Sequence, residues 1–164
     1  MQCRLAYMID SVSPSLPQSL VHEWLERECA LVVCQNDSAP SADEWAGYLR
    51  ELRRLTRIEH RVLLYTEIHL TRQQQTELED ATRSPIAPRV AVVSPSNAVR
   101  FVASIFTLLN RNIRFFSPQH YAGALTHLQL RPQEIAAVTT CYGKLMERVG
   151  ARGSQETTRR LRTR

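Results

Sequence analysis

The sequence predicts a single α/β domain built on a mixed, mostly parallel sheet of four to five strands with flanking helices. Three observations predict this class. Residues 89–116 contain a β-branched run, a Ser-Pro step, a helical pattern and a second apolar run, which indicates a βαβ unit joining parallel strands. The segment His60–Thr66 carries a continuous apolar run and fits a strand covered on both faces, near the sheet centre. A chain of 164 residues is the usual size of one domain.

The first forty residues are expected to form two strands with a short helix between them. Residues Cys3–Ile9 alternate weakly and indicate a first strand. A short helix is predicted next, because apolar residues recur at helical spacing at Leu20, Val21, Trp24 and Leu25. The apolar run Ala30–Cys34 predicts a second strand, and the polar residues after it predict a loop that ends at Pro40.

A helix over residues 42–57 is predicted next. Ser41 stands three residues before Glu44, which is the spacing of a capping box. The residues that follow place an apolar stripe on one face and arginines on the others. After the central strand, Thr71 begins a polar helix over residues 72–82 that offers little apolar surface.

Two further helices are predicted after the βαβ unit. Ser117 can cap a short helix that has Pro118 at its first position. A last helix begins near Pro132, keeps one apolar face and ends at Gly150. The domain therefore spans residues 1–149, and residues 150–164 read as a flexible, arginine-rich tail.

Composition narrows the possible partners and cofactors. Five arginines against one glutamate give the tail +4 of the net charge of +5, so the basic character belongs mainly to the tail. The tail has no interleaved aromatic residues, so nucleic acid is not an expected partner. No apolar run reaches membrane-spanning length and no secretory signal is recognisable at the start, so a cytoplasmic location is expected. The cysteines are scattered and predict reduced core residues rather than metal ligands.

Ligands of open parallel sheets bind at the carboxyl ends of the strands, near a switch in strand order. Candidate ligand-binding residues therefore follow the predicted strands: Thr66, Glu67, His69, Thr71, Ser94, Ser96, Asn97, Arg100 and Ser117. The helix start near Ser94 could hold an anion. The simpler interpretation makes Ser94 the helix cap and Pro95 the first helical residue.

No enzyme or cofactor is expected. Glu67 and His69 could act as a general acid and base only if a nucleophile and an oxyanion site converged on them. The glycines form neither a phosphate-binding loop nor a dinucleotide-binding turn, so nucleotide cofactors of those kinds are excluded.

The helix predicted over residues 95–109 carries two apolar rows and a narrow polar stripe. Two rows exceed what one sheet face requires, so the excess packs either on the helix over residues 132–149 or on another chain. The candidate partner-binding residues are Ala98, Phe101, Ile105 and Leu108.

Three segments carry a family resemblance: residues 62–67, 90–96 and 113–118, which read Val-Leu-Leu-Tyr-Thr-Glu, Val-Ala-Val-Val-Ser-Pro-Ser and Ile-Arg-Phe-Phe-Ser-Pro. With the order of elements over residues 41–130, they resemble the SpoIIAA-like branch of the STAS superfamily of small bacterial regulators. The resemblance implies mixed strands with helices on one side, and action through protein partners or small ligands without catalysis. The turn at residues 66–71 lacks the Asp-Ser-Ser-Gly signature of phosphorylated members, which leaves Thr71 as the remaining candidate for such a switch.

The hypothesis that follows is a non-enzymatic regulatory or scaffolding module acting through protein–protein contact, with a homodimer as one form of that contact. The first alternative is a small-ligand or lipid-binding carrier with its site at the strand ends. A hydrolase-type enzyme that uses Glu67 and His69 is the second alternative.

Overall fold

The computed structural model describes residues 18–97, 99 and 112–150 of the chain. Three predicted features lie outside these residues: the strand at Cys3–Ile9, most of the helix over residues 95–109, and the tail after Gly150.

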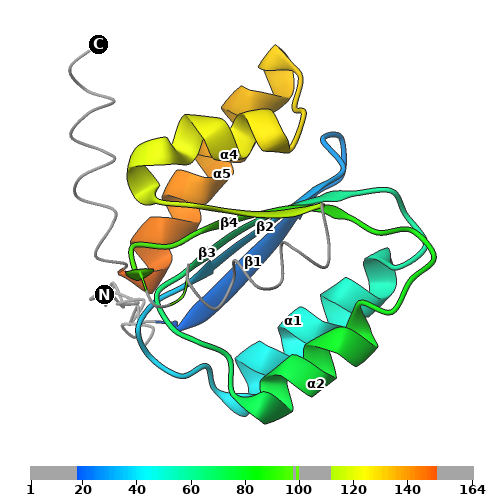
Figure 1. Cartoon of the computed structure of the whole chain (residues 1–164), viewed down its shortest axis with the longest axis vertical. Helices are drawn as coiled ribbons and strands as arrows, with labels where there is room; N and C mark the ends of the chain where they lie inside the picture. The colour runs from blue at the N-terminus through cyan, green and yellow to red at the C-terminus, as the bar shows by residue number, and fades with distance from the viewer. Residues whose placement is uncertain (1–17, 98, 100–111, 151–164) are drawn as a thin grey trace, which may run out of the picture.

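The described residues form a five-stranded sheet with the order β1-β2-β3-β4-β5 (Figure 1). Strand β1 (Leu20–Leu25) is antiparallel to β2 (Ala30–Gln35). Strands β3 (Arg61–Thr66), β4 (Arg89–Val93) and β5 (Ile113–Phe116) continue the sheet in parallel with β2. The sheet is therefore mixed and mostly parallel, with β3 at its centre, and the predicted fold class is confirmed.

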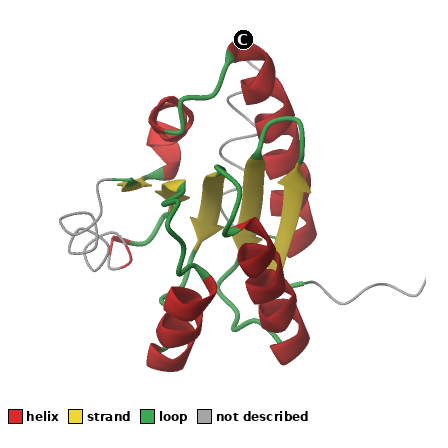
Figure 2. Cartoon of the chain, turned by 90° about the vertical axis from the view of Figure 1, so that its right-hand side faces the viewer, coloured by secondary structure: helices red, strands yellow, loops and turns green. Residues whose placement is uncertain are grey.

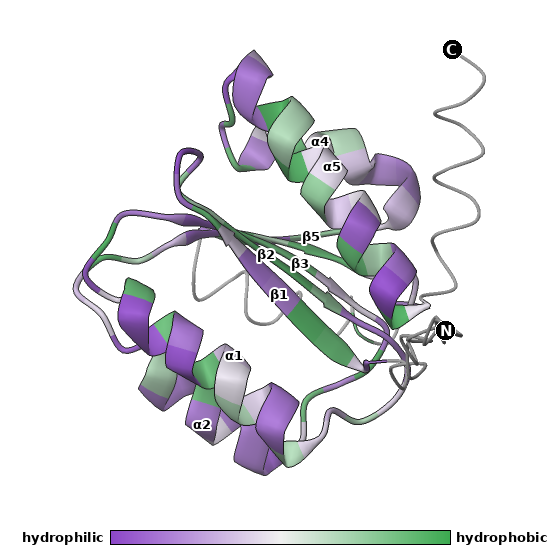
Figure 3. Ribbon diagram, turned by 180° about the vertical axis from the view of Figure 1, so that it is seen from behind, coloured by the Kyte–Doolittle hydropathy of each residue, from purple (hydrophilic) through white to green (hydrophobic). Residues whose placement is uncertain are grey.

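Helices cover both faces of the sheet (Figures 2 and 3). One face is covered by α1 (Ala42–Leu55) and α2 (Arg72–Ala81), and the other by α4 (Tyr121–His127) and α5 (Pro132–Val149). The strands supply both cores by alternation. In β2, Leu31 and Val33 pack toward α1, whereas Val32 and Cys34 pack toward α5.

The resemblance to STAS proteins implied helices on one side only, and in this respect the structure differs. Strands β2, β3 and β4 follow one another across the sheet, so two crossovers of the same hand, as the general rule expects, place α1 and α2 on the same face. The chain after β5 then turns back across the opposite face, where α5 contacts β1 and β2. The second helical layer thus comes from the segment that follows the last strand.

The helix predicted at residues 20–25 is wrong, because this segment is strand β1. Its spacing of apolar residues also fits a strand that is covered on both faces. Val21 and Leu25 face α5, whereas Leu20 and Trp24 face α1. The turn before β2 brings the segment beside the buried β2, and the hydrogen bonds of the hairpin replace those of a helix.

The ends of α1 and α5 follow the sequence signals. Ser41 and Glu44 form the predicted capping box, and α1 ends at Leu55 rather than at residue 57. Helix α5 starts at Pro132 and ends before Gly150, whose φ of 59° is the left-handed conformation that favours glycine.

Candidate functional site

The carboxyl end of the sheet was the predicted ligand site, and its hydroxyl groups make local hydrogen bonds there. The buried Thr66 hydroxyl donates to the Ile68 carbonyl at 3.0 Å. The Ser94 side chain is fully buried, and its Oγ accepts from the Ser96 amide at 3.2 Å. Both residues therefore shape turns of the backbone.

The residues after β3 are likewise engaged. Glu67 accepts a hydrogen bond of 2.7 Å from the Tyr65 hydroxyl. Thr71 is the N-cap of α2 and forms a second capping box with Gln74. His69 is exposed to solvent.

The prediction that Ser94 caps the next helix is wrong. Asn97 is the first helical residue, and Ser96 Oγ accepts from the Val99 amide at 3.3 Å, so Ser96 supplies the cap. Ser94 lies too early because its amide still donates to the Phe116 carbonyl in register with β5. Arg100 lies outside the described residues, as do the four candidate partner-binding residues Ala98, Phe101, Ile105 and Leu108.

Ser117 also differs from its predicted role. The short 3₁₀ turn Pro118–His120 has no side-chain cap, and Ser117 Oγ instead lies 2.7 Å from Nδ1 of His120.

Among the described strands there is also no switch in strand order, the feature at which the ligand-site rule places a ligand. Strands β2 to β5 lie side by side in the order of the sequence, and the helices of the two described crossovers, α1 and α2, lie on the same face. The sequence analysis did not predict one buried polar side chain at the carboxyl end of the sheet. Gln35 is almost fully buried, and its Nε2 has no hydrogen-bond acceptor within the described part of the chain.

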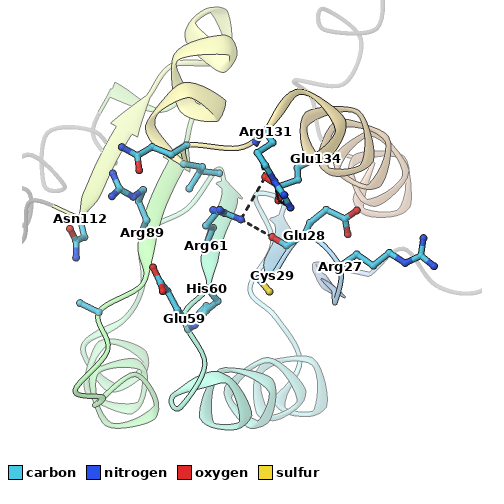
Figure 4. A pocket seen from close by; sticks show the side chains of 13 residues that line it. Arg27, Glu28, Cys29, Glu59, His60, Arg61, Arg89, Asn112, Arg131 and Glu134 are labelled. Atoms are coloured by element: carbon cyan, nitrogen blue, oxygen red, sulfur yellow. Dashed lines mark hydrogen bonds and ion pairs between the residues drawn. The ribbon is translucent and has the colours of Figure 1, made fainter.

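A pocket of about 390 Å³ opens at the opposite end of the sheet, beside the amino ends of β3 and β4 (Figure 4). It is bounded by the turn between β1 and β2, the residues before β3, β4 and β5, and the segment between α4 and α5. The lining is mostly charged or polar: Arg27, Glu28, Cys29, Glu59, His60, Arg61, Ala87, Arg89, Asn112, Leu128, Gln129, Arg131 and Glu134.

Arg61 and Arg89 occupy the same register position on adjacent parallel strands. Strand alternation places both side chains on the α4 and α5 face, and Figure 4 shows them side by side at the pocket. Two like charges on neighbouring strands repel one another unless an anion lies near them.

One of the two arginines has a counterion. Arg61 donates to the Glu28 carbonyl at 2.9 Å and lies 3.8 Å from the carboxylate of Glu134. The Arg131 side chain and amide also donate to Glu134, and these hydrogen bonds lower the pKa of that carboxyl group. Arg89 is half-buried, and within residues 18–97, 99 and 112–150 its guanidinium makes no ion pair or side-chain hydrogen bond.

The lining favours a single negative charge. Four arginines and three glutamates give it a net charge of +1, with His60 counted as neutral. Nδ1 of His60 lies 2.7 Å from the Ile58 carbonyl, so this nitrogen carries the proton and the ring is held at the pocket wall. Within the described residues, no cluster of His, Cys, Asp and Glu could hold a metal ion. Anion binding is thus the chemistry that the arrangement offers.

The cysteines agree in part with the sequence prediction. All three described cysteines are free, and Cys34 and Cys141 are buried core residues. Burial raises the pKa of the Cys141 thiol to about 12, so it is protonated at neutral pH. Cys29 is only half-buried and lies at the pocket, with a positive φ of 45°.

A signal for this pocket exists in the sequence, because Arg61 and Arg89 each begin a strand. The sequence analysis missed this signal because it considered only the residues at which strands end.

Comparison with protein-family models, curated proteins and solved structures gives no match for the chain. None of the described helices is long and apolar enough to cross a membrane.

Proposed function

We propose that the chain is a non-enzymatic regulatory module that acts through a protein partner, and that the pocket at the amino ends of β3 and β4 receives an acidic side chain of that partner. The observation that carries the proposal is the pairing of Arg89, without a counterion in the described structure, with Arg61 on the next strand.

A carboxylate is the group that suits this pair best. The planar guanidinium of Arg89 can donate two parallel hydrogen bonds to one carboxylate. The incoming charge would also relieve the repulsion between Arg89 and Arg61. Arg61 already shares the carboxylate of Glu134 with Arg131. One further negative charge would therefore bring the net charge of the pocket lining from +1 to zero.

The size and lining of the pocket argue against a lipid carrier. A volume of about 390 Å³ lies near the lower end of the range for small-ligand sites. Lipid chains require mostly apolar walls, whereas this lining is mostly charged. A small free carboxylate would satisfy the same contacts as a glutamate side chain, so a small-ligand carrier is the second candidate function.

Binding of a fluorescently labelled tetraglutamate peptide to the full chain tests the proposal, with tetraglutamine as the uncharged probe. Arg89→Ala should weaken tetraglutamate binding by between about tenfold and a hundredfold, because charge-assisted hydrogen bonds are lost. Arg72→Ala removes an exposed arginine at the other end of the sheet and should change the affinity less than about twofold.

The arginine-rich tail requires its own control, because it can attract acidic peptides without the pocket. A variant with both Arg159→Ala and Arg160→Ala should keep the difference between wild type and Arg89→Ala. The proposal fails if the tail variant loses binding while Arg89→Ala retains it. If free acetate at millimolar concentration displaces the peptide completely, the small-ligand candidate replaces the protein-binding one.

A further inference from the structure

Strand β1 forms one edge of the sheet, and among the described residues it pairs only with β2 (Figure 3). All six of its residues are in register with β2, without a bulge and without proline. Natural proteins usually protect an edge of this length with prolines, bulges, lysines or a covering segment. Of these devices, the described part of the chain gives β1 only the exposed charge of Glu23.

The register shows which backbone groups of β1 face outward. The Asn36 amide donates to the Ser19 carbonyl, so Ser19 and Asn36 form a hydrogen-bonded pair just beyond the strand. Because such pairs alternate in an antiparallel ladder, Val21, Glu23 and Leu25 bond to β2, and the backbone groups of the residues between them point away.

Part of this outward edge is already occupied. The Glu44 carboxylate accepts from the amide of Leu20 on this edge, and also from the amide of Ser19, just before the strand, at 2.9 Å. The groups that remain are the Leu20 carbonyl and the amides and carbonyls of His22 and Trp24.

We propose that these groups pair with β1 of a second copy of this chain, antiparallel and about a two-fold axis that passes beside His22. The axis lies perpendicular to the sheet, so the two sheets would join into one of ten strands. His22 would exchange two hydrogen bonds with the partner's His22. The amide of each Trp24 would donate to the Leu20 carbonyl across the axis.

Side-chain complementarity selects this register. Across the axis Trp24 meets the partner's Leu20, and Glu23 meets the partner's Val21, so no like charges are opposed. If the partner strand slides by two residues, so that the axis passes beside Glu23, four hydrogen bonds between the strands are kept. That register, however, places Glu23 opposite the partner's Glu23. The opposite shift would require the Leu20 amide, which Glu44 already holds.

Two substitutions at the same position test the dimer by analytical ultracentrifugation of the full chain. His22→Pro removes an outward amide but none of the hydrogen bonds to β2, and proline is tolerated on such an edge. His22→Ala removes the same side chain and keeps the amide. Wild type and His22→Ala should dimerise, whereas His22→Pro should raise the dimer dissociation constant by on the order of a hundredfold, about tenfold for each lost hydrogen bond.

Amide hydrogen exchange provides a second readout that does not depend on the folding of the proline variant. In wild-type protein, protection of the His22 and Trp24 amides should increase with protein concentration, because pairing is intermolecular. The inference is overturned if wild-type protein is monomeric up to millimolar concentration. Protection that is independent of concentration would also overturn it, because the edge would then be covered by the chain's own residues, such as 3–9.

Discussion

The buried carboxylate of Glu134 links the first turn of α5 to the start of β3. It accepts from the Arg131 backbone amide at 2.7 Å and from the Arg131 side chain at 2.7 and 2.9 Å. Arg61 lies 3.8 Å away on the other side. Because these donors favour the ionised form, the pKa of Glu134 lies below its usual value.

This pKa shift makes stability depend on pH. A carboxyl group whose folded pKa is depressed contributes stability above its unfolded pKa of about 4.3, and the contribution is lost as pH falls through the folded pKa. Glu134→Gln should therefore lower the free energy of unfolding by about 1–2 kcal/mol near pH 7, as for a weakened charged hydrogen bond, and by progressively less below about pH 4. Urea titrations between pH 3 and pH 7 check this.

Glu147→Gln is the matched control for this measurement, since Glu147 is exposed on the same helix. It should leave the pH dependence unchanged. If Glu134→Gln lowered the free energy of unfolding equally at all pH values, the loss of stability at acid pH could not be assigned to Glu134.

At the scale of one residue, sequence predicted what depends on near neighbours. The cap at Ser41 and the stop at Gly150 were both foreseen, because each signal lies within one helical turn. The contact between Arg61 and Glu134 joins residues far apart in the chain, so it required the fold. Ser96 replaced Ser94 as a cap because β-sheet hydrogen bonding extends one residue past β4.

At the scale of elements, the capping box of α1 offers a direct test. The Ser41 hydroxyl accepts from the Glu44 amide at 3.2 Å, and the Glu44 carboxylate accepts from the Ser41 amide at 2.7 Å. Ser41→Ala should lower the free energy of unfolding by about 1 kcal/mol, measured by chemical denaturation. Ser38→Ala, in the exposed loop before the helix, should change it by less than about 0.5 kcal/mol. Equal effects of the two substitutions would show that the hydroxyl is not acting as a cap.

Element type was predictable where one periodicity dominates. Helices α1 and α5 have apolar stripes that only a helix can align, and strands β3 and β4 are too short and too apolar to be exposed helices. Strand β1 was mispredicted because its apolar residues satisfy both periods. What decides its state is pairing with β2, which a local pattern does not contain.

At the scale of the whole molecule, the pocket lies at the end of the sheet opposite to the predicted ligand site. The described strands follow one another in the order of the sequence, so among them no reversal of strand order marks the carboxyl end as a ligand site. The amino end instead collects the β1–β2 turn, the starts of two adjacent strands and the first turn of α5. Charges that are scattered in the sequence therefore meet there.

The measurement that tests the central claim most directly is a titration of the full, isotope-labelled chain with tetraglutamate, followed by two-dimensional amide NMR. The account predicts that the largest shifts surround the pocket, at Cys29, His60, Arg89 and Asn112. Arg89→Ala should raise the tetraglutamate concentration needed to reach half of each shift by about tenfold to a hundredfold. Shifts concentrated at Thr66–Thr71 and Ser94–Asn97, or confined to residues 151–164, would contradict it.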